Sequence, residues 1–355
     1  MLLAMLQIFG VVSKMMQKGL EALRWSSAAV VLSVLLALAP QRSAVAAERN
    51  PLMREGPLDQ IRTRSEPLKK AKMTLIDFET SPFPYDGILP GTTKPFLDVT
   101  LGGRRGHRTP RGRVFWEKET YSDRRVLLHI PKEFDVSRPG VMIVFFHGHG
   151  ATLRRDVRDR QKVPAQISAS GINAVLVAPQ FAVNASDSSA GKFWKSGALE
   201  HFVGESAKKL ADLHGNPATA QTFASMPIVI VAYSGGYLPA AWCLQVGGID
   251  TRLRGVVLLD ALYGELDKFA TWTTNHKTAF FVSAYTNSTE RKNDLLKTML
   301  TKQGVAFGTA LKQKWQHGAT FLSTNSNVKH ENFVTHAWVD NPIKDILRRL
   351  GEYRR

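Results

Sequence analysis

The sequence predicts an α/β protein in which helices cover both faces of a mostly parallel sheet. Several short segments, such as residues 141–146 and 227–233, are apolar at almost every position. Continuous apolar runs of this length are typical of strands that are buried on both faces. These runs alternate with longer segments of helical character, and this alternation is typical of a parallel sheet joined by crossover helices.

The expected elements follow one another without an internal repeat. Residues 125–131 alternate apolar and polar side chains, as an antiparallel strand does. We expect further strands at residues 141–146, 173–178, 227–233, 253–262, 278–284 and 319–324, and helices at residues 153–170, 193–213, 238–244, 290–303 and 342–350.

The first 47 residues resemble a secretory signal peptide. Basic residues precede an apolar run at 26–40, and Ala44-Val45-Ala46 has the small residues of a cleavage site. The apolar run is short for a membrane span. We therefore expect cleavage near Ala46 and a periplasmic or secreted protein. Residues 48–112, rich in proline and basic residues, are expected to form an extended arm around a domain at 113–355.

The chain carries a net charge of +17. Its basic residues gather at 104–113 and 154–160, but aromatic residues are not interleaved with them, so a nucleic-acid partner is not expected. A basic face suits an anionic envelope surface. The single cysteine, Cys243, excludes an internal disulfide and is expected to be a buried thiol. Neither zinc-ligand spacing nor a phosphate-binding glycine loop is present, and we expect no metal or cofactor.

The most informative segment is Ala232-Tyr233-Ser234-Gly235-Gly236, at the end of an apolar run. A serine between small residues two positions before and after it is typical of a nucleophile elbow, a tight turn from strand to helix. Such a turn leaves backbone N–H groups at the start of the helix, beside the serine. The sequence Ser-Gly-Gly is also found in ordinary turns, so the other motifs decide between the two interpretations.

These other motifs appear in a definite order. His147-Gly148-His149-Gly150 follows an earlier apolar strand, an acidic residue follows a later one, and histidines lie near the C-terminus. This order resembles the α/β-hydrolase superfamily over residues 113–355, where the triad runs Ser…Asp/Glu…His along the chain. The resemblance implies that Ser234 is the nucleophile and that the backbone N–H groups of Gly235 and His149 form the oxyanion hole.

The acid and the base each have two candidates. Asp260 ends one apolar strand, whereas Glu290 follows the next strand at the start of a helix, where an acidic side chain has a structural reason to lie. His330 and His336 both follow the last strand. We assign Asp260 and His330 as the triad partners of Ser234.

The resemblance thus implies a serine hydrolase, of the carboxylesterase kind, that cleaves an ester or amide through an acyl-enzyme. A catalytically silent, α/β-hydrolase-like binding protein of the envelope is the alternative that the sequence leaves open. Phe193 and Trp194 either wall an acyl pocket or pack a helix onto the sheet.

Overall fold

The structure is a computed structural model that describes residues 66–315, 317–324 and 327–355. The predicted signal peptide and the first part of the predicted arm lie outside these residues. Among the described residues, no helix is long and apolar enough to cross a membrane.

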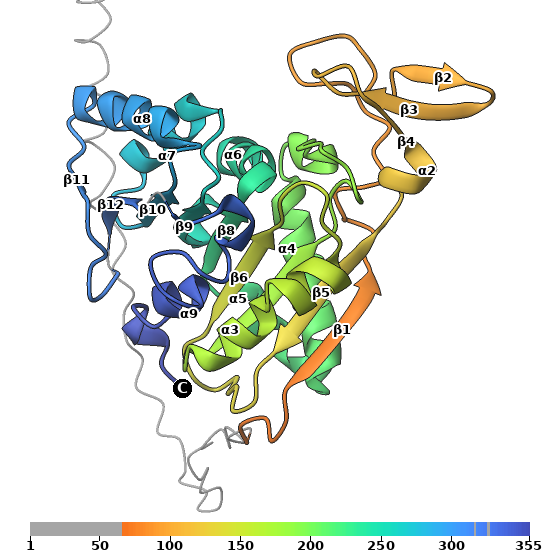
Figure 1. Cartoon of the computed structure of the whole chain (residues 1–355). Helices are drawn as coiled ribbons and strands as arrows, with labels where there is room; N and C mark the ends of the chain where they lie inside the picture. Colours follow the sequence, from red (N-terminus) through yellow and green to blue (C-terminus); the bar gives the residue numbers. More distant parts are fainter. Residues whose placement is uncertain (1–65, 316, 325–326) are drawn as a thin grey trace, which may run out of the picture. The chain divides into compact units, whose positions relative to one another are not determined.

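A nine-stranded sheet forms the centre of the described part, in the order β1-β5-β7-β6-β8-β9-β10-β12-β11 (Figure 1). Strand β5 pairs antiparallel with both β1 and β7, and the remaining pairs are parallel. The strands are β1 (Lys72–Asp77), β5 (Arg125–Ile130), β6 (Val141–Phe146), β7 (Ala174–Pro179), β8 (Ile228–Tyr233), β9 (Leu253–Leu259), β10 (Phe280–Tyr285), β11 (Phe307–Gly308) and β12 (Gly318–Ser323).

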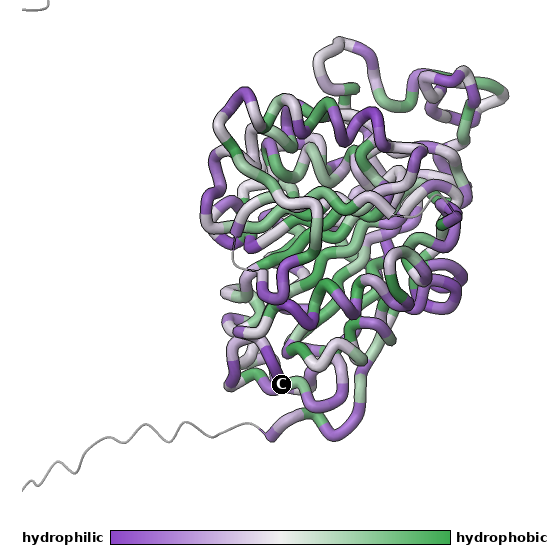
Figure 2. Tube along the Cα trace, turned by 60° about the vertical axis from the view of Figure 1, so that its left-hand side comes forward, coloured by the Kyte–Doolittle hydropathy of each residue, from purple (hydrophilic) through white to green (hydrophobic). Residues whose placement is uncertain are grey.

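Both faces of the sheet are buried because successive side chains of each strand enter different cores. In β8, Ile228, Ile230 and Ala232 belong to one apolar cluster. Val229 and Val231 belong to the other. Period-two alternation places neighbouring residues on opposite faces, so a strand buried on both sides must be apolar throughout. In Figure 2 the apolar colour accordingly follows the central strands.

Helices cover each face of the sheet. The first core packs against α4 (Ala198–His214), α5 (Ala220–Ser225), α6 (Tyr237–Val246), α7 (Leu266–Asn275) and α8 (Glu290–Lys302). The second core packs against a π-helical segment η1 (Leu153–Arg160), α3 (Val163–Ala169) and α9 (Pro342–Leu347). Figure 1 shows α3 and α9 together on one side of the strands. The predicted fold class, a mostly parallel sheet with helices on both faces, is confirmed.

The helix predicted over 153–170 is interrupted. Backbone bonds from Val157 to Thr152 and from Gln161 to Asp156 give its first part the wider π spacing. Lys162 then has φ +52°, a left-handed conformation that stops the helix before α3 begins.

The segment predicted as an arm contributes more structure than expected. Lys72–Asp77 pairs with β5 and forms an edge strand of the central sheet, so the sheet begins before the predicted domain start at residue 113. Residues 99–116 form a second sheet of β2 (Val99–Leu101), β3 (Arg104–Arg108) and β4 (Val114–Trp116). Gly102 and Gly103 both have positive φ and form the hairpin turn between β2 and β3.

Aromatic side chains attach this segment to the domain. Phe96 packs against Tyr121 and Trp194, with ring centroids 4.9 and 5.7 Å apart. The His107 ring stacks on Phe96 at 4.4 Å, and His107 Nδ1 lies 2.7 Å from the Phe96 carbonyl oxygen. Such contacts need side chains distant in sequence, and alternating patterns in short strands do not reveal them.

Candidate active site

Ser234 lies at the turn between β8 and α6, at the carboxyl end of a central strand. Its φ is +52°, a left-handed conformation that is strained for any residue with a Cβ. The surrounding glycines make the turn possible. A Cβ on Gly236 would lie 2.5 Å from the Phe146 carbonyl oxygen, and one on Gly148 would lie 2.7 Å from Ser234 Cβ. These clashes explain why the elbow needs small neighbours.

His330 joins Ser234 to Asp260. Its Nε2 lies 2.8 Å from Ser234 Oγ, and its Nδ1 lies 2.6 Å from Asp260 Oδ2. The ring stacks on Tyr233 with centroids 5.1 Å apart, while the Tyr233 hydroxyl donates a hydrogen bond to the His330 carbonyl oxygen at 2.9 Å. Tyr263 meets the ring edge to face at 6.1 Å. The imidazole is therefore fixed in orientation by its neighbours and by both nitrogens.

Asp260 immediately follows β9 and is fully buried. Its Oδ1 accepts hydrogen bonds from the Thr286 N–H at 3.1 Å and the Thr289 hydroxyl at 2.7 Å. Its Oδ2 accepts from the hydroxyls of Thr286 at 2.8 Å and Ser288 at 2.9 Å, besides facing His330. Burial alone would raise the pKa of Asp260, but the bonds from His330, Thr289 and Thr286 outweigh it and lower the pKa to about 2. The carboxylate is thus ionised at neutral pH.

The competing candidates lie elsewhere. Glu290 is exposed in the first turn of α8, where its charge favours the helix N-terminus. His336 is exposed as well, with Nδ1 2.9 Å from the Thr335 hydroxyl and Nε2 3.7 Å from Asp340. The structure therefore brings together Ser234, Asp260 and His330.

Gly235 and His149 meet beside the serine. A Cβ on Gly235 would lie 2.4 Å from His149 Cδ2, so the imidazole of His149 packs directly on this glycine. Within the described residues, neither the backbone N–H of Gly235 nor the backbone N–H of His149 donates a hydrogen bond to another protein group. Two free donors next to a nucleophile can stabilise an oxyanion. The His149 ring is held by the Ser188 hydroxyl, 2.6 Å from Nε2.

The other histidine of this loop, His147, has a structural role. It is buried, and burial lowers its pKa to about 4, so the ring is neutral at pH 7. Its Nδ1 donates to the Gly148 carbonyl oxygen at 2.8 Å, and its Nε2 accepts from the Phe181 N–H at 2.9 Å. His147 therefore fixes the loop from the inside.

A cavity of about 640 Å³ opens onto the serine. It is lined by Arg111, His149, Gly150, Ala151, Asp156, Arg160, Ser188, Tyr233, Ser234, Gly235, Tyr237, Tyr263, His330 and Glu331. Phe193 does not line this cavity. Its side chain is buried between Phe146 and Phe202, which agrees with the predicted alternative that it packs a helix onto the sheet. Trp194 packs on Tyr85 and Phe96.

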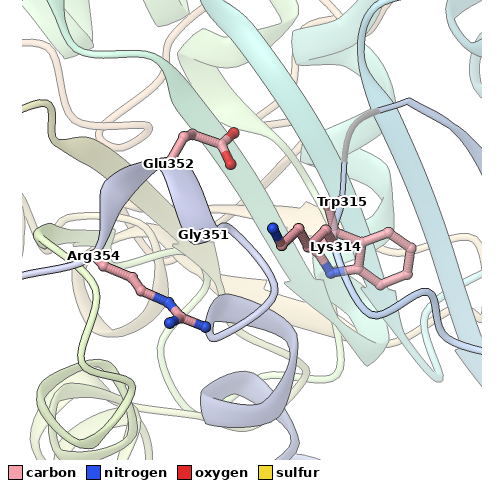
Figure 3. A pocket seen from close by; sticks show the side chains of 5 residues that line it. All are labelled: Lys314, Trp315, Gly351, Glu352 and Arg354. Atoms are coloured by element: carbon pink, nitrogen blue, oxygen red, sulfur yellow. The ribbon is translucent and has the colours of Figure 1, made fainter.

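A second hollow of about 380 Å³ lies near the C-terminus (Figure 3). Lys314 and Trp315 lie on one side of it, and Glu352 and Arg354 on the other. Trp315 is buried, with its indole N–H donating to the Ile346 carbonyl oxygen at 3.2 Å, and Glu352 pairs with Arg254 at 3.2 Å. These contacts are structural, and among the described residues no serine, cysteine or histidine lines the hollow.

No group of three or more His, Cys, Asp or Glu side chains in the described part of the chain could hold a metal ion. Cys243 is buried, as predicted, and burial raises its pKa well above the usual value.

Sequence comparison finds nothing: no protein-family model and no curated protein matches. Structure comparison finds a feruloyl esterase module from Clostridium thermocellum complexed with sinapinate, with TM-score 0.42 and 13% identity, covering 75% of this chain and 95% of that one. It also finds an S-formylglutathione hydrolase from Agrobacterium tumefaciens, with TM-score 0.42 and 12% identity, covering 72% and 97%. Esterase 2 of Thermogutta terrifontis gives TM-score 0.35 and 12% identity, covering 64% and 85%.

The observation that decides the fold is internal to the chain. A serine elbow stands at the carboxyl end of a central strand of a mostly parallel sheet, and acid and histidine follow it in that order. The chain has the α/β-hydrolase fold.

Sequence reasoning did not find several residues of the site. Thr286 and Thr289 bind the acid, Tyr233 fixes the histidine, and Ser188 holds His149. Arg111 belongs to the basic run at 104–113, and nothing in that run indicates that it lines the cavity.

Proposed function

We propose that the protein is a serine hydrolase that cleaves a carboxylic ester or amide through an acyl-enzyme on Ser234. The observation that carries the proposal is the unbroken chain of contacts from Asp260 Oδ2 through His330 to Ser234 Oγ, at 2.6 and 2.8 Å. A serine hydroxyl is a weak nucleophile until a base takes its proton, and a histidine oriented by a carboxylate is such a base.

In the proposed reaction, Ser234 Oγ attacks the carbonyl carbon while its proton passes to His330 Nε2. The negative charge that forms on the carbonyl oxygen is stabilised by the Gly235 and His149 N–H groups. The ester bond then breaks, and the leaving alcohol takes the proton from His330. Asp260, whose pKa of about 2 keeps it ionised, stabilises the imidazolium throughout. A water molecule, deprotonated by His330, hydrolyses the acyl-enzyme by the reverse sequence.

Export and envelope association belong to the same proposal. The supporting features are the signal-peptide pattern of residues 1–47 and the net charge of +17. A basic protein would be held electrostatically at an anionic envelope surface, and this retention would weaken as salt rises.

A fluorophosphonate probe tests the catalytic proposal. We expect it to label the wild type at Ser234, found by peptide mass spectrometry, and not to label Ser234→Ala. The matched control is Ser122→Ala, since Ser122 is an exposed serine outside the cavity. His330→Ala should abolish rapid labelling, whereas His336→Ala should retain it.

A folded wild-type protein that the probe leaves unlabelled, and that releases no nitrophenol from 4-nitrophenyl butyrate, would favour the catalytically silent binding protein. Loss of labelling in His336→Ala instead of His330→Ala would keep the hydrolase and overturn the choice of base.

A further inference from the structure

Arg111 brings an unpaired positive charge to the cavity of Ser234. It is exposed in the turn between β3 and β4 and lines the cavity. No hydrogen bond or ion pair within the described residues engages its guanidinium group. The neighbouring arginines are engaged: Arg104 pairs with Glu119 at 2.8 Å, and Arg105 pairs with Glu117 at 2.6 Å.

The turn that carries Arg111 is held in place. The Thr109 N–H donates to the Arg113 carbonyl oxygen at 2.9 Å, and the Gly112 N–H donates to the Thr109 carbonyl oxygen at 2.8 Å. Gly112 has φ +83°, which a glycine adopts without strain. Upstream, His107 is buried against Phe96. The guanidinium group is therefore presented by a hydrogen-bonded turn and not by an unstructured loop.

The charge of Arg111 reaches two other residues that line the cavity, Tyr237 and His149. Burial, followed by Glu265, raises the pKa of Tyr237, and the positive charge of Arg111 opposes this shift. Burial lowers the pKa of His149, and Arg111 adds to this shift. Asp187, whose charge also reaches His149, already accepts hydrogen bonds from the Tyr121 and Ser189 hydroxyls at 2.9 and 3.0 Å.

Arg160, the other arginine that lines the cavity, already has partners. Arg160 binds Asp156 Oδ1 at 2.9 Å and the Glu331 carbonyl oxygen at 3.1 Å. The exposed Glu331 side chain adds a negative charge beside His330. Of the two arginines that line the cavity, Arg111 is thus the one that can bind an anionic group of a substrate, whereas Glu331 disfavours such a group beside His330.

We infer that the substrate is an ester whose acyl part carries a carboxylate, a monoester of a dicarboxylic acid, and that Arg111 binds this carboxylate. The inference rests on the proposed function. His330 must protonate the leaving alcohol, so the alcohol lies beside His330. The carboxylate is assigned to the acyl part because Glu331 disfavours a second negative charge beside His330. One guanidinium group and one carboxylate match in charge and in bidentate geometry.

The reaction is otherwise unchanged. The acyl group with its distal carboxylate moves to Ser234 Oγ, the alcohol leaves with the proton from His330, and water releases the dicarboxylic acid.

The test compares 4-nitrophenyl monoesters of linear dicarboxylic acids, from adipate to suberate, with 4-nitrophenyl esters of monocarboxylic acids of equal chain length. Shorter dicarboxylates are left out because their own carboxylate attacks the ester. We expect kcat/KM for the charged ester to exceed that for its neutral partner by about tenfold for at least one chain length, as a charge-assisted hydrogen bond in a partly exposed cavity gives. High salt should reduce this ratio.

Arg111→Gln should lower the ratio by about tenfold, and Arg111→Lys should restore part of it. The matched control is Arg113→Gln: Arg113 is exposed, does not line the cavity and lies over the Phe115 ring at 5.1 Å, so its loss should leave the ratio unchanged.

Each outcome decides. If neutral esters are hydrolysed at Ser234 but the charged esters are never preferred, or if Arg111→Gln keeps the ratio, the inference fails and the proposed function stands. If the folded protein hydrolyses no ester, the inference fails; the proposed function fails as well if the fluorophosphonate probe leaves Ser234 unlabelled.

Discussion

Replacing the Asp260 carboxylate by an amide, in Asp260→Asn, tests the site most directly. The two carboxylate oxygens have different partners. Oδ1 faces the Thr286 N–H, a donor that cannot reverse its direction, whereas Oδ2 faces the Thr286 and Ser288 hydroxyls and His330. Hydroxyls can rotate and an imidazole can change tautomer. The amide oxygen should therefore keep the Oδ1 position, and the amide nitrogen should face His330.

With the amide in this orientation, His330 adopts the opposite tautomer. An amide N–H would donate to Nδ1 and move the histidine proton to Nε2, which then no longer accepts the proton of Ser234. The wrong tautomer costs a triad about 10⁴-fold in kcat, which corresponds to about 5.5 kcal/mol of transition-state stabilisation. The assay is kcat for 4-nitrophenyl butyrate at pH 7, with circular dichroism to establish that the variant is folded.

Glu290→Gln is the matched control because it makes the same chemical change at the rival position. Glu290 is exposed at the start of α8, so the variant should keep kcat and lose about 0.3–1 kcal/mol of helix stabilisation. The reasoning is refuted if Asp260→Asn keeps kcat within about tenfold of wild type, or if Glu290→Gln loses as much as we expect of Asp260→Asn.

Two further predictions follow from the same region. Gly235→Ala places a Cβ 2.4 Å from His149 Cδ2 and should lower kcat about 100-fold by displacing the oxyanion donors. The control Gly204→Ala, which adds a Cβ in open space, should leave kcat unchanged. Equal kcat values in the two variants would contradict this prediction. The folded-state pKa of Asp260, about 2, lies below the usual 3.8. The ionised carboxylate therefore stabilises the folded protein above pH 3.8, and this contribution is lost as the pH falls toward 2. Urea unfolding should show that this contribution, about 2 kcal/mol, is missing in Asp260→Asn, and the same acid sensitivity in both proteins would count against it.

The sequence was most informative where local pattern and burial agree. The apolar runs predicted β6 over 141–146 and located the other central strands to within a few residues, because a strand buried on both faces must be apolar throughout. The antiparallel direction of β5 was also predicted correctly, from its alternating side chains. The serine elbow was predicted from small residues at fixed spacing, since its steric demands are local.

The arm was least predictable because its structure depends on distant partners. Strands of three residues, such as β2 and β4, are too short for an alternating pattern to appear. Their sheet is held by aromatic contacts between residues far apart in sequence, for example Phe96 with Trp194. The position of Arg111 in the cavity follows from that packing, so a basic run alone could not predict it.

Residues just before Glu290 stabilise the charge of Asp260, and this bears on the choice between the two acids. Asp260 adopts φ +44° at the end of β9, and its buried charge requires donors on every side. Those donors come from the segment after β10: Thr286 and Thr289, just before Glu290, supply an N–H and two hydroxyls. The residues before α8 therefore donate hydrogen bonds to Asp260, whereas Glu290 is exposed to solvent. Consistent with this, Thr289 makes no capping bond at the start of α8 and gives its hydroxyl to Asp260 instead. The Thr289 hydroxyl thus stabilises the charge of Asp260 and not the start of α8. This favours Asp260 over Glu290 independently of the distance to His330.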